Sequence, residues 1–283
     1  MSKILITGAS GQLGTELRYL FDNKKINYEA PSSHELNIRD SNHVDSYFEK
    51  ELPAYVFHCA AYTAVDQAED SKDENWAVNA IGTENIAKAS QKVGATLVYI
   101  STDYVFDGEK TEKYSVEDSI NPRNEYGKAK LAGEQAVQQY CNEYYIVRTS
   151  WVFGEYGNNF VYTMLRLAKS YDRLTVVADQ FGRPTWTKTL ADFLLYIYMK
   201  HPDYGIYHLS NDGSCSWYDF ACEILKNNDI EIEPITSVEY PQKAYRPKNS
   251  IMNLEKTKKL GFEIPTWKEA LEDFLKSLEL KGN

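Results

Sequence analysis

Residues 4–14 read Ile4-Leu5-Ile6-Thr7-Gly8-Ala9-Ser10-Gly11-Gln12-Leu13-Gly14, an apolar run followed at once by glycines in the spacing GxxGxxG. The run predicts a buried strand, and a helix is expected over residues 12–21. In such a unit Gly8 permits a tight turn, Gly11 lets the backbone approach a pyrophosphate, and Gly14 lets helix and strand pack closely. The helix N-terminus then offers unpaired N–H groups to phosphate. The stretch favours a dinucleotide-binding turn over a plain strand-to-helix turn.

Strand-like and helix-like segments alternate through the first half of the chain. Repeated strand–helix–strand units indicate parallel pairing, because parallel neighbours need crossover connections. Near-continuous apolar strands fit a sheet that is covered on both faces. The fold class is therefore α/β, a doubly wound parallel sheet of the Rossmann type with a smaller C-terminal substrate lobe. The expected strands cover residues 3–7, 28–30, 55–59, 96–100 and 145–148, and the expected helices cover 12–21, 41–51, 73–93 and 126–140.

The rhythm becomes less regular after residue 150. We expect residues 1–150 to form the dinucleotide-binding domain and 151–283 the substrate-binding lobe, with about 187–209 returning to the main sheet. Prolines at 234, 241 and 247 punctuate the later segment. Within this half, helices are expected at 158–170, 187–199, 217–227 and 267–278, and a strand at 205–209.

Composition excludes several classes of protein. The 283 residues are 43% hydrophobic and carry a formal net charge of −10 without a basic cluster, so nucleic acid is not an expected partner. There is no apolar run of about 18 residues and no signal-like N-terminus, so neither a membrane span nor export is expected, and cytoplasmic residence is the default. Four scattered cysteines argue against a disulfide framework or a metal cage.

The end of the second expected strand bears on the choice of coenzyme. A carboxylate there would bind the adenosine ribose and favour NAD. Here residues 31–34 read Pro-Ser-Ser-His, and no acid occurs before Glu35. Small hydroxyl groups can admit a 2′-phosphate, so NADPH is expected, with NADH tolerated. Asn37 and Ile38 are expected to flank the adenine.

Tyr126 and Lys130 form a YxxxK pair on the helix expected at 126–140. At positions i and i+4 the two side chains share one helix face. Reduction of a ketone leaves an alkoxide that must take a proton, and a free tyrosine, with a pKa of about 10, exchanges protons poorly near neutrality. A neighbouring ammonium is expected to lower that pKa, and the lysine also suits the nicotinamide ribose. Chance occurrence on a solvated helix is the alternative for the pair taken alone.

Thr102 closes the fourth expected strand. Ligands of open α/β sheets bind at the carboxyl ends of strands, so the Thr102 hydroxyl is placed to orient a substrate carbonyl beside Tyr126. The alternative is that Thr102 caps a turn.

Several motifs occur in an order that resembles the dTDP-4-dehydrorhamnose reductases, which are extended short-chain dehydrogenases. Residues 3–185 carry most of the likeness, and residues beyond about 200 match only loosely. The motifs are the glycine turn, Cys-Ala-Ala-Tyr-Thr-Ala-Val-Asp at 59–66, Asn-Ala-Ile-Gly-Thr at 79–83, Ser-Thr-Asp-Tyr-Val-Phe-Asp-Gly at 101–108, Tyr-Gly-Lys-Ala-Lys at 126–130 and Arg-Thr-Ser-Trp-Val at 148–152.

The resemblance implies hydride transfer from NADPH to C4 of a dTDP-4-keto-6-deoxyhexose, giving dTDP-rhamnose or a close epimer. Tyr126 would be the general acid, Lys130 its electrostatic partner and ribose ligand, and Thr102 the residue that orients the carbonyl. The implied coenzyme ligands are Gly8, Ser10, Gly11, Gln12, Leu13, Asn37, Ile38, Ala60, Ala61, Tyr62, Asn79 and Lys130. The implied substrate contacts are Val65, Asp103, Tyr104, Trp151 and Arg183.

Two of these roles have structural alternatives. Arg183 lies in a loop, residues 181–185, that resembles one in the family, and a bidentate pairing with the substrate diphosphate is weighed against a turn-forming role. Trp151 is weighed against core packing. Some relatives hold magnesium with glutamates, but the segment 187–190 has no acid, so no metal is expected.

Two other functions remain as alternatives. A sugar-nucleotide epimerase or dehydratase would use the same turn and the same Tyr–Lys pair with a permanently bound NAD. A non-catalytic regulatory subunit would keep the nucleotide fold and bind an enzyme. Net consumption of NADPH separates the reductase from both. A nucleotide sugar is the expected substrate, and a homodimer is compatible with the sequence.

Overall fold

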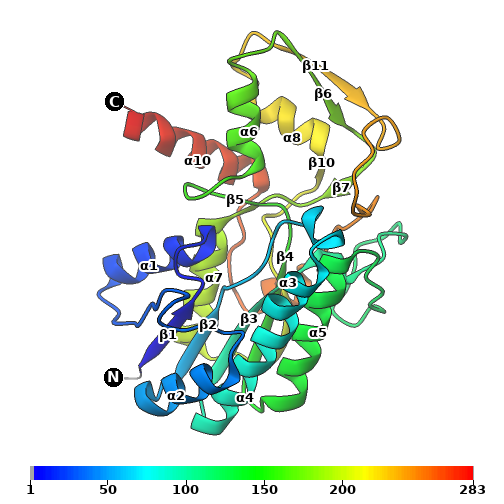
Figure 1. Ribbon diagram of the computed structural model, residues 1–283. Coiled ribbons are helices and arrows are strands. Elements are labelled where there is room, and N and C mark those ends of the chain that lie inside the picture. Colours follow the sequence, from blue (N-terminus) through cyan, green and yellow to red (C-terminus); the bar gives the residue numbers. More distant parts are fainter. Residues whose placement is uncertain (1–2, 283) are drawn as a thin grey trace.

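The centre of the molecule is a parallel five-stranded sheet. The computed structural model describes residues 3–282. The strands lie in the order β1 (Ile4–Thr7), β2 (Tyr55–His58), β3 (Thr96–Thr102), β4 (Tyr144–Thr149) and β9 (Gly205–His208), and each pairs in parallel with the next (Figure 1). The predicted parallel sheet is confirmed.

Both faces of the sheet are buried under helices. On one face, Ile4 and Ile6 of β1 pack with residues of α1 (Gln12–Lys24) and α7 (Thr187–Lys200). On the other face, Leu5 packs with residues of α2 (Ser41–Glu51), α4 (Thr83–Val93) and α5 (Glu125–Tyr140). Alternate residues of one strand therefore enter different cores, as a doubly wound sheet requires.

The expected strand at 28–30 is only a single bridge. Glu29 exchanges two backbone hydrogen bonds with Ile4 and Ile6, on the edge of β1 opposite to β2. The pairing ends there because residues 32–35 fold into a turn in which the Glu35 carboxylate accepts from the Ser32 amide and hydroxyl. β1 therefore has a neighbour on each of its edges. The point where the strand order reverses lies at the end of β1, beside Gly8.

The helix expected at 73–93 is divided into three parts. α3 (Lys72–Trp76) is followed by a π-helical turn, η2 (Ala77–Gly82), and then by α4. π-turns inside helices occur often at functional sites. Asn79 lies in this turn. A π-turn holds one residue more than an α-helical turn, and the spacing of apolar residues in the sequence does not reveal this insertion.

Apart from α7, β9 (Gly205–His208) and the short helix that packs on β9, the elements beyond β4 form a lobe at one end of the sheet (Figure 1). Its core joins α6 (Phe160–Leu167), α8 (Trp217–Ile224) and α10 (Trp267–Gly282). The short strands are β5 (Val152–Phe153), β6 (Arg173–Val177), β7 (Phe181–Gly182), β8 (Thr185–Trp186), β10 (Cys215–Ser216) and β11 (Glu231–Ile235). The remaining short helices are η1 (Gln67–Glu69), η3 (Asp103–Val105) and α9 (Glu255–Lys258).

The parallel pair of β6 and β11 was not expected from the sequence. Pro234 lies inside β11, where a proline argues against a strand. β11 has a partner on one edge only, so a residue without an N–H is accommodated there. No helix within residues 3–282 combines the length and the apolar character that crossing a membrane requires.

Candidate active site

The glycine turn forms a cradle with no room for side chains. Gly8 has φ +65°, and a Cβ there would lie 2.4 Å from the Ala60 nitrogen. A Cβ on Gly14 would lie 2.2 Å from the Gly8 carbonyl oxygen. Gly11 is the N-cap of α1 and supplies no capping side chain, so the first N–H groups of the helix stay available to an anion. The cradle fits a pyrophosphate.

Gln12 has a second role that spacing did not reveal. Its amide donates to the Asn158 carbonyl at 3.2 Å and accepts from Asn159 at 3.4 Å. The Gln12 side chain therefore ties the coenzyme cradle to the loop that leads into α6. Its backbone N–H, together with that of Leu13, remains the group suited to phosphate. Ser10 is exposed in the turn.

Asn79 fixes the segment that follows β2. Its side-chain amide accepts from the Tyr62 N–H at 3.0 Å and donates to the Tyr62 carbonyl at 2.9 Å. It also donates to Asn75 at 2.7 Å, and Asn75 donates to the Glu125 carbonyl at 2.8 Å. Both asparagines are fully buried. The loop of Ala60, Ala61 and Tyr62 is thereby linked to the residue before Tyr126, and Asn75 is a member of the site that the motifs did not indicate.

The expected adenine-side residues lie between α2 and α4. Ile38 is buried in the core beneath Gly82, and its carbonyl accepts from Asn85 at 2.9 Å. Asn37 is half-buried, and its side chain accepts from the Arg39 backbone and guanidinium. The Ser32 hydroxyl, expected to face a 2′-phosphate, donates to Glu35 instead. Arg39 is the exposed cation beside the predicted adenine residues.

Thr102 ends β3 and begins the turn η3. Its hydroxyl accepts from the Tyr104 N–H at 3.2 Å and donates to Asp103 at 3.1 Å. The capping role is therefore present, and the Thr102 hydroxyl is also close enough to Tyr126 to lower the pKa of its phenol. Asp103 is 3% exposed, and burial raises the pKa of its carboxyl group to about 6, although the nearby Ser250 and Thr102 hydroxyl groups act in the opposite direction.

Tyr126 lies in the first turn of α5, which begins after the N-cap Asn124. The Asn124 side chain accepts from the Gly127 N–H at 2.7 Å, and a Cβ on Gly127 would lie 2.3 Å from the Tyr104 carbonyl oxygen. The helix start is thus pressed against η3. The Tyr126 and Tyr104 rings meet edge to face with centroids 5.9 Å apart.

The pKa of Tyr126 shifts in the direction opposite to the one expected from the sequence. Burial is the largest cause of its rise, Asp103 adds to it, and the Thr102 hydroxyl opposes it. Lys130 does not compensate, because its ammonium donates to the Ile100 carbonyl at 2.7 Å and lies 4.1 Å from the centre of the Tyr99 ring. A raised pKa keeps the phenol protonated, and a protonated phenol is the form that donates a proton to an alkoxide.

Lys130 itself is 2% exposed, and burial lowers its pKa to about 7. The Glu134 carboxylate and the Cys59 thiol act in the opposite direction. The pKa of Lys130 therefore lies close to neutral pH.

Trp151 has φ +46°, an uncommon backbone conformation for a large residue. Its indole stacks on Trp217 of α8 at 3.6 Å between ring centroids, with 10° between the planes. Gly182 packs against the indole, where a Cβ would approach to 2.5 Å. Backbone strain of this kind gathers at functional sites. Trp217, which lines the cavity described below, was not singled out by the sequence.

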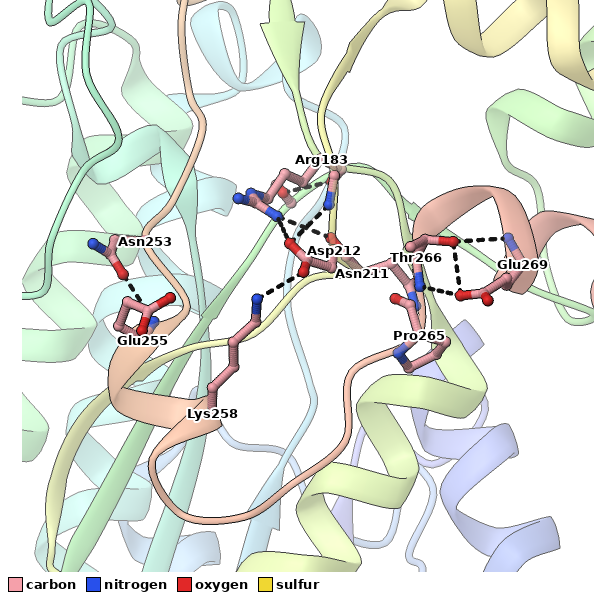
Figure 2. A network of polar contacts seen from close by, with 11 residues as sticks. Arg183, Asn211, Asp212, Asn253, Glu255, Lys258, Pro265, Thr266 and Glu269 are labelled. Carbon is pink, nitrogen blue, oxygen red and sulfur yellow. Dashed lines mark hydrogen bonds and ion pairs between the residues drawn. The ribbon is translucent and has the colours of Figure 1, made fainter.

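Arg183 is buried and ion-paired. Figure 2 shows its guanidinium directed at Asp212, to which it is ion-paired at 2.8 Å, and Lys258 approaches the same carboxylate at 2.7 Å. Arg183 is 3% exposed, and its carbonyl accepts from the Ser150 hydroxyl. These contacts favour the turn-forming alternative, because the guanidinium is buried, does not line the cavity described below, and is ion-paired through one terminal nitrogen.

A cavity of about 930 Å³ opens between the lobe and the segment near residue 240. Tyr104 lies on its wall, so the cavity reaches the ring that meets Tyr126. Arg246 also lines it, ion-paired to Asp66 at 2.9 Å with its guanidinium 5.7 Å from the centre of the Tyr104 ring. Val65 is the neighbour of Asp66 in the chain. Apolar walls with a few polar groups and two arginines, Arg173 and Arg246, suit a nucleotide sugar.

A glycine cradle and a Tyr–Lys pair at the carboxyl end of a doubly wound sheet place the chain among the extended short-chain dehydrogenases. A family model described as RmlD substrate binding domain matches residues 2–280. The chain belongs to the dTDP-4-dehydrorhamnose reductase family, as its motifs predicted.

Three relatives illustrate the match. The spore coat polysaccharide biosynthesis protein SpsK of Bacillus subtilis is 42% identical over 97% of both chains. A dTDP-4-dehydrorhamnose reductase of Aggregatibacter actinomycetemcomitans is 41% identical over 96% of this chain and 98% of its own. The crystal structure of a dTDP-4-dehydrorhamnose reductase from Bacillus anthracis in complex with NADP is 43% identical, with a TM-score of 0.94 over 98% of this chain and all of that one.

Proposed function

We infer that this chain reduces the C4 keto group of a dTDP-4-keto-6-deoxyhexose, dTDP-4-dehydrorhamnose, with NADPH as the hydride donor. The observation that carries the inference is the Tyr126 phenol. It lies in the first turn of α5, and its ring meets the ring of Tyr104, which lines a cavity of nucleotide-sugar size. The likeness to named reductases extends over nearly the whole chain.

The residues of the glycine turn fit the coenzyme. The bare cradle at Gly8 and Gly14 and the uncapped start of α1 would hold the pyrophosphate. Bound NADPH supplies a hydride to the substrate carbon. Arg39, beside Asn37, is the cation placed for a 2′-phosphate, and it supports the preference for NADPH over NADH.

Side chains of the protein orient the substrate and transfer the proton. Thr102 and Tyr126 orient the substrate carbonyl through their hydroxyl groups, and Tyr126 gives its proton to the new C4 oxygen. Lys130 would bind the ribose and stabilise the tyrosinate that remains. Asp103 and Tyr104 contact the sugar from η3.

Arg246 replaces Arg183 as the proposed ligand of the substrate diphosphate. It is the arginine that lines the cavity near Tyr104, and one of its terminal nitrogens is buried without a hydrogen-bond partner. The stacked pair of Trp151 and Trp217 would form a flat wall for the sugar nucleotide.

We also propose that the protein is cytoplasmic and that the chain divides at residue 150. In that division residues 1–150 bind the coenzyme, and 151–283 carry the substrate walls and return at 187–209 to the sheet. We further propose a homodimer, which light scattering tests by measuring the molar mass of the protein in solution.

An NADPH-oxidation assay tests the proposed reaction. Purified protein is mixed with dTDP-4-keto-6-deoxyhexose and, in parallel, with its UDP- and GDP-linked counterparts. Stoichiometric NADPH loss with the dTDP compound is expected. Conversion of the sugar without net coenzyme consumption would identify an epimerase or a dehydratase instead.

A further inference from the structure

A buried ion pair lies one helical turn beyond Lys130. Glu134 is fully buried on α5, and Arg148 of β4 is 2% exposed. The guanidinium donates twice, from Nε to Glu134 Oε1 at 2.9 Å and from an Nη to Oε2 at 2.7 Å. The Ser101 hydroxyl of β3 donates to Oε1 as a third contact at 2.5 Å. α5 is therefore tied to the two central strands by a bidentate charge-assisted contact.

The pair stands in line with the catalytic residues. Tyr126, Lys130 and Glu134 are spaced by four residues each and share one face of α5. Ser101, which donates to Glu134, directly follows Ile100, whose carbonyl accepts from the Lys130 ammonium. A displacement of Glu134 along β3 would therefore carry Lys130 and Tyr126 with it.

The far side of Arg148 faces an aromatic ring and a histidine. Its guanidinium lies 5.2 Å from the centre of the Phe106 ring and 3.5 Å from His208 Nε2. Burial and Arg148 lower the pKa of His208 to about 3, so this imidazole is neutral. Arg148 is thus neutralised through Glu134.

The groups that face Lys130 come from three elements. β2 contributes His58 and the residue after it is Cys59; burial shifts their pKa values to about 3 and about 12, so both are neutral. β3 contributes the Tyr99 ring and the Ile100 carbonyl. α5 contributes Glu134, which carries the negative charge among these groups.

We propose that the Glu134–Arg148 pair, closed by Ser101, is the positioning element of the catalytic helix, and that it keeps Lys130 an ammonium at the coenzyme site. The proposal rests on the proposed role of Lys130. Without Glu134, two buried cations, Lys130 and Arg148, lie between α5 and the sheet. The ammonium of Lys130 then loses its proton at a lower pH.

The test is the titration of Lys130 in the coenzyme-free protein, followed by the Cε chemical shift of labelled lysine. Wild type, Glu134→Gln and the double variant Glu134→Met/Arg148→Met are compared, and Lys130→Met assigns the signal. We expect a fall of about one pH unit in the Lys130 midpoint for Glu134→Gln. The double variant leaves no unpaired Arg148, so it remains informative if the single variant fails to fold. Its Lys130 midpoint should also fall, because Glu134 is missing.

A matched control is Glu272→Gln, which removes an exposed Glu–Lys pair on α10. The pH dependence of kcat is measured alongside, and its alkaline limb should move with the Lys130 midpoint. A folded Glu134 variant with an unchanged midpoint would overturn the proposal. If Tyr126→Phe or Lys130→Met retains full turnover, the proposed catalytic roles fail instead, and the titration still reports on the ion pair.

Discussion

Replacing Gly8 by alanine should weaken coenzyme binding in a protein that still folds. Gly8 has φ +65°, and a Cβ would stand 2.4 Å from the Ala60 nitrogen, whereas ordinary contacts begin at 3.4 Å. The turn or the loop after β2 must therefore retreat by about 1 Å. A left-handed alanine adds about 1–2 kcal/mol of backbone strain.

Gly94 provides the matched control. It has φ +72°, and nothing lies within 4 Å of its Cβ position. Gly94→Ala therefore carries the same backbone strain without the collision, far from the glycine cradle at the end of α4. Both variants should lose about 2–4 °C in Tm per kcal/mol of destabilisation.

The two variants should differ in NADPH affinity, measured by fluorescence titration. Gly8→Ala should raise Kd at least about tenfold, which corresponds to about 1.4 kcal/mol, because the cradle can no longer close on a pyrophosphate. Gly94→Ala should bind NADPH like wild type. A folded Gly8→Ala protein with wild-type affinity would refute the assignment of the cradle.

Three further results are expected. Arg246→Met should raise KM for the nucleotide sugar about tenfold or more, since charge-assisted hydrogen bonds contribute about 1.5–3 kcal/mol, whereas Arg183→Met should lower the urea midpoint and leave KM unchanged; a KM effect confined to Arg183 would reverse the assignment. Arg39→Ala should raise KM for NADPH and not for NADH, and an equal effect on both coenzymes would remove Arg39 from the 2′-phosphate site. His58 is buried and neutral with its pKa lowered to about 3, so the unfolded chain binds its proton first and stability falls as pH drops below about 6.5. In urea titrations between pH 6 and 4.5, His58→Asn should flatten the slope of unfolding free energy by about 1.4 kcal/mol per pH unit, and an unaltered slope would show that this histidine is protonated in the native state.

Local sequence signals predicted the parallel part of the fold well. Apolar runs and the caps at Asp40 and Asn124 mark elements whose bounds are set by neighbouring residues, so α2 and α5 begin within a residue of the expected positions. The strand at 28–30 failed because the turn centred on Ser32 ends its pairing after one bridge.

Contacts between distant residues were harder to predict. Arg183 looked like a free anion ligand because its partner Asp212 lies 29 residues further along the chain. The proposed ligand Arg246 was not singled out, because it lies in a proline-punctuated segment with no periodicity, and only the tertiary fold brings it to Asp66. The sign of the Tyr126 shift depends on Asp103 and on burial, neither of which follows from the spacing of Tyr126 and Lys130.

The most direct test of the central claim is single-turnover reduction of dTDP-4-dehydrorhamnose by the NADPH-loaded protein, compared between wild type and Tyr126→Phe. The account predicts a fall in rate of about 10²–10⁴-fold, with the Kd for NADPH unchanged. Reduction by Tyr126→Phe at the wild-type rate would show that the proton comes from another group.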